Sequence, residues 1–456
     1  MCPFRAEPPN VISPSNRLLF WTGGLLVPSA TVAVMSPEAA LIGWAGVAVF
    51  AFVAIVDALM GAQALDGLTV EAEPIIRVSK DREATVSLTI NNPAQKSRGL
   101  RLGLPWPRDI DTEEDELLTL LPSKAESSRV HWNFTPRRRG KYHLSRCHLE
   151  GRSPFGLWNV RRPTPIESEI RVYPNLLTER KHVAAIFLNR GTFGMHAQRQ
   201  IGKGRDFEKL REYIPGDGYD EIHWKATAKR GKPVTKVFQI ERTQEIYVIV
   251  DSSRLTSREV AIPSTDGTTT TLERFITASL ILGLAAERQG DLFGLVSFSN
   301  QADSFVRAKN GKAHYAHCRD ALYTLEPKLV SPDFEEMAAF LRTRLRRRAL
   351  LVFLTELDDP VLAEQFIKSM DLLSRQHLIL VNILQSPKVK PLFEDSNITS
   401  MDEIYEHLGG HLRWRELREL DKKLRQRGVT FSTLENERMS AQLVTQYLNV
   451  KRRQLI

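Results

Sequence analysis

An aspartate and a serine in one short turn are the residues of this chain best suited to chemistry. Asp251 directly follows the apolar stretch 246–250, and Ser253 lies two residues further on. A hard divalent cation such as Mg²⁺ prefers carboxylate and hydroxyl oxygens, and this turn supplies both at the end of an expected strand. The alternative is that Asp251 only caps the turn that follows it. The pattern leaves both interpretations open.

A second carboxylate is available at Glu356, which follows another apolar stretch, 349–354. The acidic pair 358–359 offers further candidates close behind it. Leu255 stands where a third ligand of an Asp-x-Ser-x-Ser pattern would carry its hydroxyl. The sequence therefore predicts a Mg²⁺ site made of Asp251, Ser253 and Glu356, with one position of the pattern missing.

The segment 202–225 is dense in glycine, charge and aromatic residues and fits no single helical or strand period. At its centre is a Pro-Gly-Asp turn, in which proline presets φ and glycine permits a positive φ. We interpret the segment as a connector rather than a catalytic site, because it lacks a nucleophile paired with a base. Its signature residues, expected to mediate interaction, are Arg211, Tyr213, Pro215, Gly216, Asp217, Trp224 and Lys225.

The main alternative is an enzyme that acts on cell-envelope or peptide substrates. It would use Asp217, His223 and Asp251 in a cleft between domains, provided that these side chains come within hydrogen-bond reach of one pocket. The chain contains no HExxH, GxSxG or GxxxxGK[ST] motif, which removes common hydrolase and nucleotide-binding signatures. We therefore expect no enzymatic activity and no catalytic residues.

The elements that position these residues are alternating strands and helices in the last part of the chain. Near-continuous apolar stretches at 245–250, 292–298, 349–354, 378–383 and 429–434 indicate strands buried on both faces of a sheet. Between the first two, apolar residues recur at helical spacing over 272–288, which predicts a βαβ unit. Repetition of this unit gives a doubly wound α/β domain whose ligands meet the carboxyl ends of the strands.

An earlier region, from about 68 to 174, shows short apolar segments that alternate with polar residues, separated by Asn-Pro, Pro-Arg and Arg-Gly breaks. Period-two alternation of this kind indicates half-buried strands. With no helical stretch among them, these strands predict a small β-sandwich.

Two uncharged stretches near the start, 18–37 and 39–56, each approach the roughly 20 residues that a helix needs to cross a bilayer. A signal peptide or a buried hairpin of a soluble domain is disfavoured, because two apolar spans follow each other and the second is apolar all round. Only Glu38 carries charge between them, whereas basic residues flank the pair at Arg5, Arg17, Arg77, Lys80 and Arg82. The positive-inside rule then predicts a two-span inner-membrane protein with both termini and the main body in the cytoplasm.

Composition and charge limit the classes of protein to which this chain can belong. The 456 residues suggest several domains, and a net charge of +9 fits either nucleic acid or an anionic membrane surface. The three cysteines form no CxxC pair, so neither a disulfide framework nor a zinc ribbon is expected. Basic runs at 137–141 and 342–348 are expected to be solvated, with weak anionic-lipid contact as a secondary use. No recognisable nucleic-acid-binding module is present, so no nucleic-acid partner is expected.

The string from Arg211 to Ala226 closely resembles the signature of the domain of unknown function 58 (DUF58) family. Segments at 139–142, 153–157 and 171–174 resemble the β region that precedes this signature in that family. The resemblance implies a von Willebrand factor A-like domain behind a β domain and two membrane spans. It also implies an adaptor or substrate role, because such proteins are often encoded beside MoxR-type AAA+ ATPases.

In von Willebrand factor A domains, an Asp-x-Ser-x-Ser motif contributes to a metal-ion-dependent adhesion site. Asp251 and Ser253 match its first two positions, Leu255 departs from the third, and Glu356 stands where an aspartate is commoner. The resemblance thus implies a degenerate adhesion site that binds Mg²⁺ weakly or not at all.

Together these observations predict a multi-domain chain with two transmembrane helices, a β-sandwich-like domain and a doubly wound von Willebrand factor A-like domain. The expected boundaries are a hairpin at 1–65, a β-sandwich at 66–175, a connector at 176–240 and the α/β domain at 241–456. The function expected is that of a non-enzymatic membrane-anchored adaptor that binds a protein partner, with a MoxR-type ATPase as the candidate.

Overall fold

The computed structural model describes residues 10–35, 40–177, 179–181, 184, 201–215, 218–239, 244–261, 267–386, 388–391 and 401–453. The chain is multi-domain and divides into two compact units, Met1–Asn175 and Leu176–Ile456. The first unit is β-rich and carries a helical hairpin, and the second is α/β. Each unit is described separately below.

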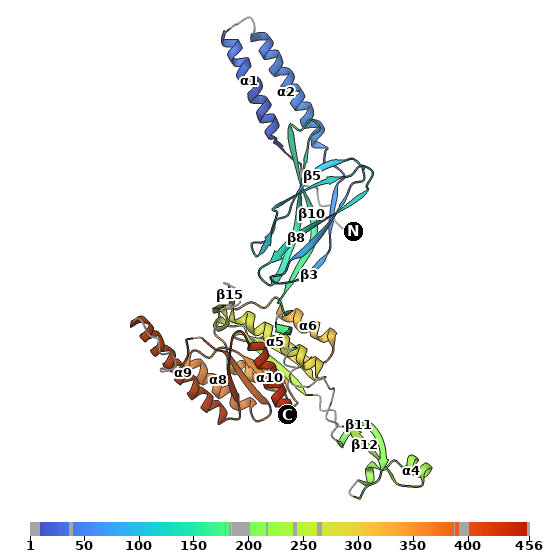
Figure 1. Ribbon diagram of the computed structural model, residues 1–456, viewed down its shortest axis with the longest axis vertical. Helices are drawn as coiled ribbons and strands as arrows, with labels where there is room; N and C mark the ends of the chain where they lie inside the picture. Colours follow the sequence, from blue (N-terminus) through green and yellow to red (C-terminus); the bar gives the residue numbers. More distant parts are fainter. Residues whose placement is uncertain are drawn as a thin grey trace. The chain divides into compact units, whose positions relative to one another are not determined.

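The hairpin consists of helices α1 (Asn16–Met35) and α2 (Ala40–Ala62), which lie side by side (Figure 1). A Cβ on Gly43 would lie 3.3 Å from the Cβ of Ser29, so small residues let the two backbones approach closely. Of the described helices, only α2 is long and apolar enough to cross a membrane, over Leu41–Ala62. The helix α1 falls short of the span expected over 18–37, because polar and small residues interrupt its apolar sequence.

The β-rich part consists of two sheets. The first has the order β1-β10-β9-β5-β7, with β3 paired in parallel to β10, and the second has the order β2-β4-β8-β6. The strands of the first sheet are β1 (Val11–Pro14), β3 (Ile75–Ser79), β5 (Arg98–Gly103), β7 (Glu116–Leu121), β9 (Gly140–Arg152) and β10 (Trp158–Tyr173). Those of the second are β2 (Thr69–Ala72), β4 (Ala84–Asn91), β6 (Ile110–Thr112) and β8 (Ser127–Pro136).

One hydrophobic core lies between these two sheets. Val86, Leu88 and Ile90 alternate along β4 and are fully buried, as period-two patterning requires for a strand with one inward face. Trp132 of β8 and Leu149 of β9 belong to the same core. The alternating segments of the sequence therefore do form strands that share one core.

The second unit contains a small two-stranded arm, β11 (Ile201–Glu212) paired with β12 (Val234–Gln239). Between the two strands come a 3-10 turn, η1 (Tyr219–Glu221), and a short helix, α4 (Trp224–Arg230). Gly231 ends α4 in the left-handed conformation at φ 67°, which glycine adopts without steric cost. The described part of the predicted connector from Ile201 to Gln239 is thus a β-hairpin, with a short helix between its two strands.

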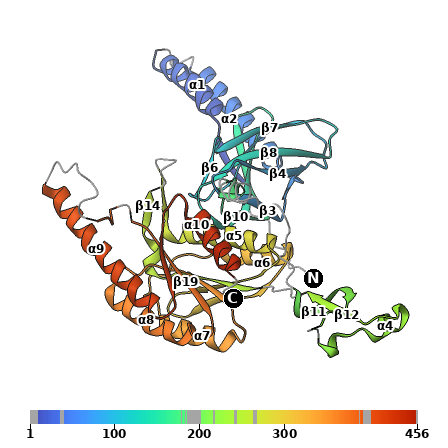
Figure 2. The same cartoon turned by 60° about the horizontal axis from the view of Figure 1, so that its bottom comes forward.

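The main sheet of the second unit has the order β17-β16-β13-β18-β19-β20 (Figure 2). Its strands are β13 (Glu245–Asp251), β16 (Leu292–Phe298), β17 (Ala302–Lys309), β18 (Leu350–Leu354), β19 (Leu378–Leu384) and β20 (Thr430–Leu434). All neighbours pair in parallel except β17, an antiparallel edge strand reached by a short turn from β16. The sequence predicted the five parallel strands but not β17, whose weak alternation is typical of a half-exposed edge.

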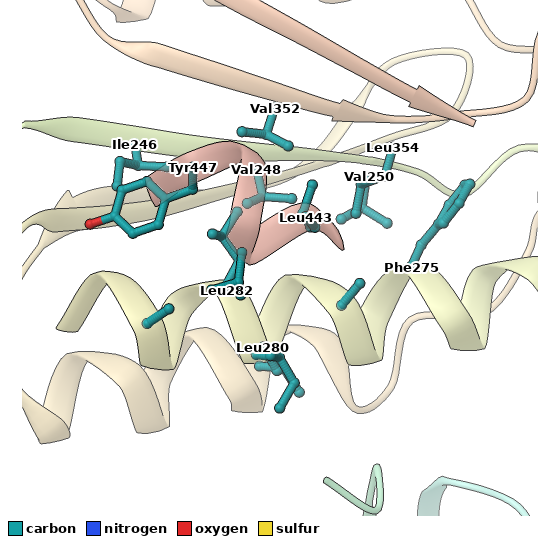
Figure 3. Packing of buried hydrophobic residues seen from close by; sticks show 14 of the residues in the cluster. Ile246, Val248, Val250, Phe275, Leu280, Leu282, Val352, Leu354, Leu443 and Tyr447 are labelled. Atoms are coloured by element: carbon teal, nitrogen blue, oxygen red, sulfur yellow. The ribbon is translucent and has the colours of Figure 1, made fainter. Parts of the chain in front are cut away.

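Helices cover both faces of this sheet. One face packs against α5 (Thr271–Arg288), α6 (Lys312–Leu322) and α10 (Met439–Arg452). The other packs against α7 (Phe334–Arg344), α8 (Pro360–Leu373) and α9 (Met401–Arg425). Figure 3 shows the core between the sheet and the helices α5, α6 and α10, where Val248 and Val250 of β13 pack near Phe275 and Leu282 of α5. A short η2 turn (Arg254–Ser257) and a β14 (Glu259–Ala261)–β15 (Thr268–Thr270) hairpin follow β13.

Candidate functional site

The candidate site lies at the carboxyl ends of β13 and β18, the two central strands of the α/β sheet. The chain runs from β13 outward through β16 to β17, and then returns to β18 on the other side of β13. In doubly wound sheets such a reversal opens a crevice at the carboxyl ends of the strands, where ligands commonly bind. Asp251 ends β13, and Thr355 and Glu356 directly follow β18.

Asp251 is fully buried and bonded on both of its carboxylate oxygens. Its Oδ1 accepts a hydrogen bond from the backbone N–H of Ser253 at 2.8 Å, and its Oδ2 accepts one from the Thr355 hydroxyl at 2.6 Å. Burial raises the pKa of Asp251 to about 6, and these hydrogen bonds oppose the rise because they favour the charged form. Asp251 therefore both holds its own turn and joins β13 to β18.

Ser253 is also fully buried, at the N-cap of η2. Its Oγ accepts a long hydrogen bond, 3.4 Å, from the backbone N–H of Leu255, and its carbonyl accepts one of 3.0 Å from the Thr256 hydroxyl. The structure thus brings Asp251 and Ser253 into one turn, as the spacing predicts. The hydrogen bonds observed within this turn are those expected if Asp251 and Ser253 cap it.

Glu356 is 4% exposed, and its Oε1 accepts a hydrogen bond of 3.1 Å from the backbone N–H of Leu384 at the end of β19. Burial raises the pKa of Glu356 to about 8, and the negative charges of Asp358 and Asp251 add to the rise. Within the described ranges, no group of three or more acidic, histidine or cysteine side chains could hold a metal ion. The charge of Asp251 therefore affects the pKa of Glu356, but the hydrogen bond of Glu356 is to the neighbouring strand β19.

Several residues of this edge were not identified from the sequence. Thr355, which binds Asp251, was overlooked because a threonine beside an acidic residue has no distinctive spacing. The Ser252 hydroxyl lies 2.9 Å from the Phe298 carbonyl and 3.2 Å from Asp303 Oδ2, and Asp303 forms an ion pair with Lys328. These contacts tie the turn after β13 to β17 and to the segment before α7.

Asn382 is another residue that the sequence analysis missed. It lies in β19, beside Leu354 in the parallel register, and is fully buried. Neither polar atom of its side chain has a hydrogen-bond partner among the described residues, although such groups are usually bonded. An asparagine inside the otherwise apolar stretch 378–384 was the available sequence clue.

The rim of the site is built around Asp358. Arg413 of α9 donates to Asp358 Oδ1 at 2.7 Å and to the Leu357 carbonyl at 2.6 Å, and Arg258 approaches Asp358 Oδ2 at 3.4 Å. Asp359, the other sequence candidate, caps α8 through the N–H of Val361 at 2.8 Å. Both acids therefore have structural partners, and Asp358 fixes the middle of α9 beside the edge of the sheet.

The signature residues lie on the β11–β12 arm, apart from Gly216 and Asp217, which fall outside the described residues. Tyr213 stacks on Tyr219 with ring centroids 6.3 Å apart, and its N–H donates to the Pro233 carbonyl at 3.0 Å. Arg211 is in β11, and Pro215 lies in the turn after it. Trp224, 68% exposed, begins α4 and is followed by Lys225.

His223, a member of the alternative catalytic set, has a structural role in this arm. Its Nδ1 accepts a hydrogen bond of 3.0 Å from the backbone N–H of Ala226, and it is the N-cap residue of α4. The Thr227 hydroxyl accepts from the Val234 N–H at 3.0 Å and ties α4 to β12. The His-Trp-Lys motif therefore starts α4 and presents its tryptophan to the outside.

Comparison with known proteins gives a match to one family model over part of the chain. Residues 209–399 match the family described as protein of unknown function DUF58. The match begins in β11 and includes both the signature and the candidate site, which confirms the resemblance for this part of the chain. Comparison with curated proteins returned no match.

Solved structures with distant likeness include two from Bacteroides. An aerotolerance-related membrane protein from Bacteroides fragilis is 14% identical over 44% of this chain and 99% of its own, with a TM-score of 0.28. The conserved hypothetical protein BatB from Bacteroides thetaiotaomicron is 12% identical over 45% and 99%, with a TM-score of 0.29. A membrane spanning protein from Vibrio fischeri is 12% identical over 45% and 98%, with a TM-score of 0.18. At these TM-scores the likenesses carry no conclusion about this chain.

Proposed function

We propose that this chain is a membrane-anchored adaptor without catalysis of its own, whose α/β unit binds a protein partner, a MoxR-type AAA+ ATPase. The match of residues 209–399 to DUF58 supports the family context on which the choice of partner depends. The apolar helix α2 supports membrane anchoring. The single observation that carries partner binding is an exposed apolar row on α9.

This row, which we call the α9 stripe, consists of Met401, Tyr405, Leu408 and Leu412. The four side chains are 66%, 67%, 43% and 53% exposed. They follow one another at intervals of four, three and four residues, which places them in one line along a helix and is typical of a helix–helix seam. Exposed apolar residues in a continuous row commonly mark a protein-interaction site, whereas scattered ones do not.

The second half of α9 holds the stripe in place. Leu420 and Leu424 are buried in the core between α9 and the sheet, whereas the first turns extend beyond this core (Figure 2). Within these turns, Glu406 is bound by Lys388 at 2.7 Å. Further along the line of the stripe, Arg415 and Glu419 replace apolar side chains. Because Arg413 binds Leu357 and Asp358, the stripe lies beside the same edge of the sheet as the candidate site.

The α/β unit is proposed to be a von Willebrand factor A-like domain, supported by the parallel sheet and by the Asp-x-Ser turn at its central strand. Asp251, Ser253 and Glu356 would form a degenerate metal-ion-dependent adhesion site in which Mg²⁺ is completed by a partner carboxylate. A cation must displace the proton of Glu356 and compete with the Thr355 hydroxyl, which makes any such binding weak and dependent on pH. The signature residues of the arm, Trp224 above all, are proposed as a second contact surface.

The membrane arrangement is proposed to be two spans in the inner membrane, with both termini and the main body in the cytoplasm. The hydroxyls of Ser29 and Thr31 in α1 donate to carbonyls of their own helix, at 2.7 and 2.8 Å, which satisfies them within an apolar environment. The basic residues that flank the hairpin support the cytoplasmic orientation.

The experiment is co-purification of the full-length chain from detergent-solubilised membranes with a MoxR-type ATPase. The test variant is Leu408→Glu with Leu412→Glu, and the matched control is Leu329→Glu, since Leu329 is 88% exposed in the same unit but lies outside α9. We expect the control to retain the ATPase and the test variant to lose it. Equal recovery with both would refute the role of the α9 stripe, and no recovery with the unmodified chain would refute the partner.

The metal part of the proposal is tested separately by Asp251→Ala and by chelation. If Mg²⁺ completes the docking surface, both treatments should weaken ATPase recovery to a similar extent. Recovery that survives both would remove the cation from the mechanism while leaving the adaptor function intact.

A further inference from the structure

The one charged residue of α2 is a carboxylate, Asp57, which is enclosed by the β-rich part of the chain. Asp57 is fully buried, and its oxygens accept three hydrogen bonds from the turn 153–157, which joins β9 to β10. The donors are the Ser153 hydroxyl at 2.5 Å and the backbone N–H groups of Phe155 at 2.9 Å and Leu157 at 3.1 Å. Charge-assisted bonds of this kind are about twice as strong as neutral ones.

Further contacts hold the same turn against both helices of the hairpin. The indole N–H of Trp158 donates to the Ala54 carbonyl of α2 at 2.8 Å. The Ser15 hydroxyl, one residue before α1, donates to the Gly156 carbonyl at 2.7 Å. A Cβ at Gly61 would lie 3.0 Å from the Cβ of Ser153, so α2 and the turn are in direct contact. The turn is therefore fixed beside the last two turns of α2.

The outer side of this turn combines an apolar side chain with two cations. Phe155 is 59% exposed at the tip. Arg17, at the start of α1, lies over Gly156, with its Nη1 3.4 Å from the position of a Cβ there. Arg17 and Arg152 are exposed and have no ion-pair or hydrogen-bond partner among the described residues. By contrast, Arg161 on the neighbouring strand is paired with Glu150 at 2.5 Å.

The basic run 137–141 occupies the opposite end of the same strand. It precedes and begins β9, whose 13 residues span about 40 Å before the turn 153–157 is reached. Arg137 is bound to Asp111 at 2.7 Å, and Lys141 is bound to Glu169 at 2.8 Å. Lipid contact by this run, expected from the sequence, is therefore less well supported than contact by the other end of β9.

We propose that the turn 153–157, together with Arg17 and Arg152, is an interfacial anchor that binds the phosphate headgroups of anionic lipids while Phe155 enters the headgroup layer. The proposal rests on the proposed membrane span of α2. A span that begins at the start of α2 and takes about 20 residues ends close to Asp57, so the turn bound to Asp57 would lie at the membrane surface. Segments that lie in the membrane interface commonly combine Lys or Arg with exposed Trp, Phe or Leu side chains. Each arginine near an anionic membrane surface raises the binding constant for that surface by roughly fivefold.

The first experiment measures depth in the bilayer. The full chain with Cys2→Ser is reconstituted into phosphatidylcholine–phosphatidylglycerol vesicles, since Cys147 and Cys318 are fully buried and should not react. Spin labels are placed through Val49→Cys, Phe155→Cys and Glu83→Cys, and collision rates with oxygen and with a water-soluble nickel chelate are compared. Val49 is 64% exposed in α2. Glu83 is exposed in the turn before β4, close to Lys80, whose N–H binds the Tyr173 carbonyl at the opposite end of β10 from the turn 153–157.

We expect the label at 49 to be deep, the label at 155 to be at headgroup depth and the label at 83 to be in water. A label at 155 as accessible to nickel as that at 83, with 49 deep, would overturn the anchor alone. A label at 49 that is accessible to nickel would instead refute the membrane span, and with it the proposed anchoring. The two failures are therefore distinguishable.

The second experiment tests lipid charge. The unlabelled chain is purified from mixed micelles that contain both lipids, and the phosphatidylglycerol retained per chain is compared for the unmodified chain and for Arg17→Gln with Arg152→Gln. We expect the double variant to lose most of its preference for phosphatidylglycerol, by about tenfold or more. Arg161→Gln is the control and should keep it. Unchanged retention in the double variant, or equal competition by free inorganic phosphate, would overturn headgroup binding.

Discussion

Two buried carboxylates differ in the number of hydrogen bonds that they accept. Asp57 lies five residues before the end of α2, and Glu356 lies two residues after β18. Asp57 accepts three hydrogen bonds from a single turn. Glu356 accepts one, from the N–H of Leu384, and its pKa is raised to about 8. The comparison teaches that burial alone does not define a role. Asp57 joins α2 to the turn 153–157, whereas the raised pKa of Glu356 makes this residue sensitive to pH near neutrality.

The largest effect expected is from Asp57→Ala. This change leaves the Ser153 hydroxyl and two backbone N–H groups without their common acceptor in a buried place, which should destabilise the first unit by about 4 kcal/mol. Thermal unfolding in detergent would measure it. Asp57→Asn keeps an acceptor and should lose less, and equal stability of all three chains would contradict the anchoring role of Asp57.

A slightly smaller effect is expected from Glu356→Gln, with a distinct pH dependence. The pKa of Glu356 in the folded chain, about 8, is above the ordinary value of 4.5, so the folded state binds its proton more tightly than the unfolded state does. Its stabilising contribution is complete below about pH 4.5 and is lost as pH rises toward 8. The variant should therefore be more stable than the unmodified chain by about 3 kcal/mol at pH 8 and similar at pH 5.

Chemical unfolding at the two pH values would measure this difference. Glu364→Gln on α8 is the matched control, because Glu364 is exposed and paired only with Lys368. The control should shift stability by less than about 0.5 kcal/mol at either pH. A variant at Glu356 with the same pH profile as the unmodified chain would show that Glu356 does not titrate in this range.

Thr355→Val should have a moderate effect that is also dependent on pH. The Thr355 hydroxyl donates to Asp251 Oδ2 and lowers the pKa of Asp251, which burial raises to about 6. Its removal should raise the pKa of Asp251 further and cost about 1 kcal/mol of stability above pH 6. Unfolding curves from pH 5 to 8 would reveal a loss that grows with pH, and a uniform loss would indicate simple repacking.

The smallest effect on stability is expected from Leu408→Ala in the α9 stripe. Leu408 is 43% exposed, so truncation should change the free energy of unfolding by less than about 0.5 kcal/mol. The same assay used for the buried sites would check this. A loss above about 1.5 kcal/mol would show that the stripe packs within the chain, which would remove its proposed role as a docking surface.

Much of the α/β fold could be predicted from the sequence, because parallel strands buried on both faces form continuous apolar stretches. The turn of Asp251 and Ser253 was also predictable, since both bonds that define it are local. What the sequence did not reveal depends on contacts between distant segments. Ser153 and Asp57 are 96 residues apart, and no local pattern indicates that one binds the other.

The direction of a side chain at a strand end was equally hard to predict. Glu356 was expected beside Asp251, but it binds the backbone of Leu384, because β19 lies next to β18 and offers a free N–H at its end. The motif 153–157 was identified from its resemblance to a family, and only the structure shows that it holds the hairpin. Two equal spans were expected because both stretches lack charge. The polar and small residues in α1 make it less apolar than α2, which is the one described helix apolar enough to span a membrane.

The strand β10 extends from Trp158, which binds α2, to Tyr173, two residues before the first unit ends. A force applied to the chain beyond Asn175 would therefore load β10 along its length, as far as its contact with α2. This strand is paired over most of its length with β9 and, near its end, with β3. Stretching would therefore have to shear many hydrogen bonds at once instead of opening them one by one, and β10 would act as a stiff tether.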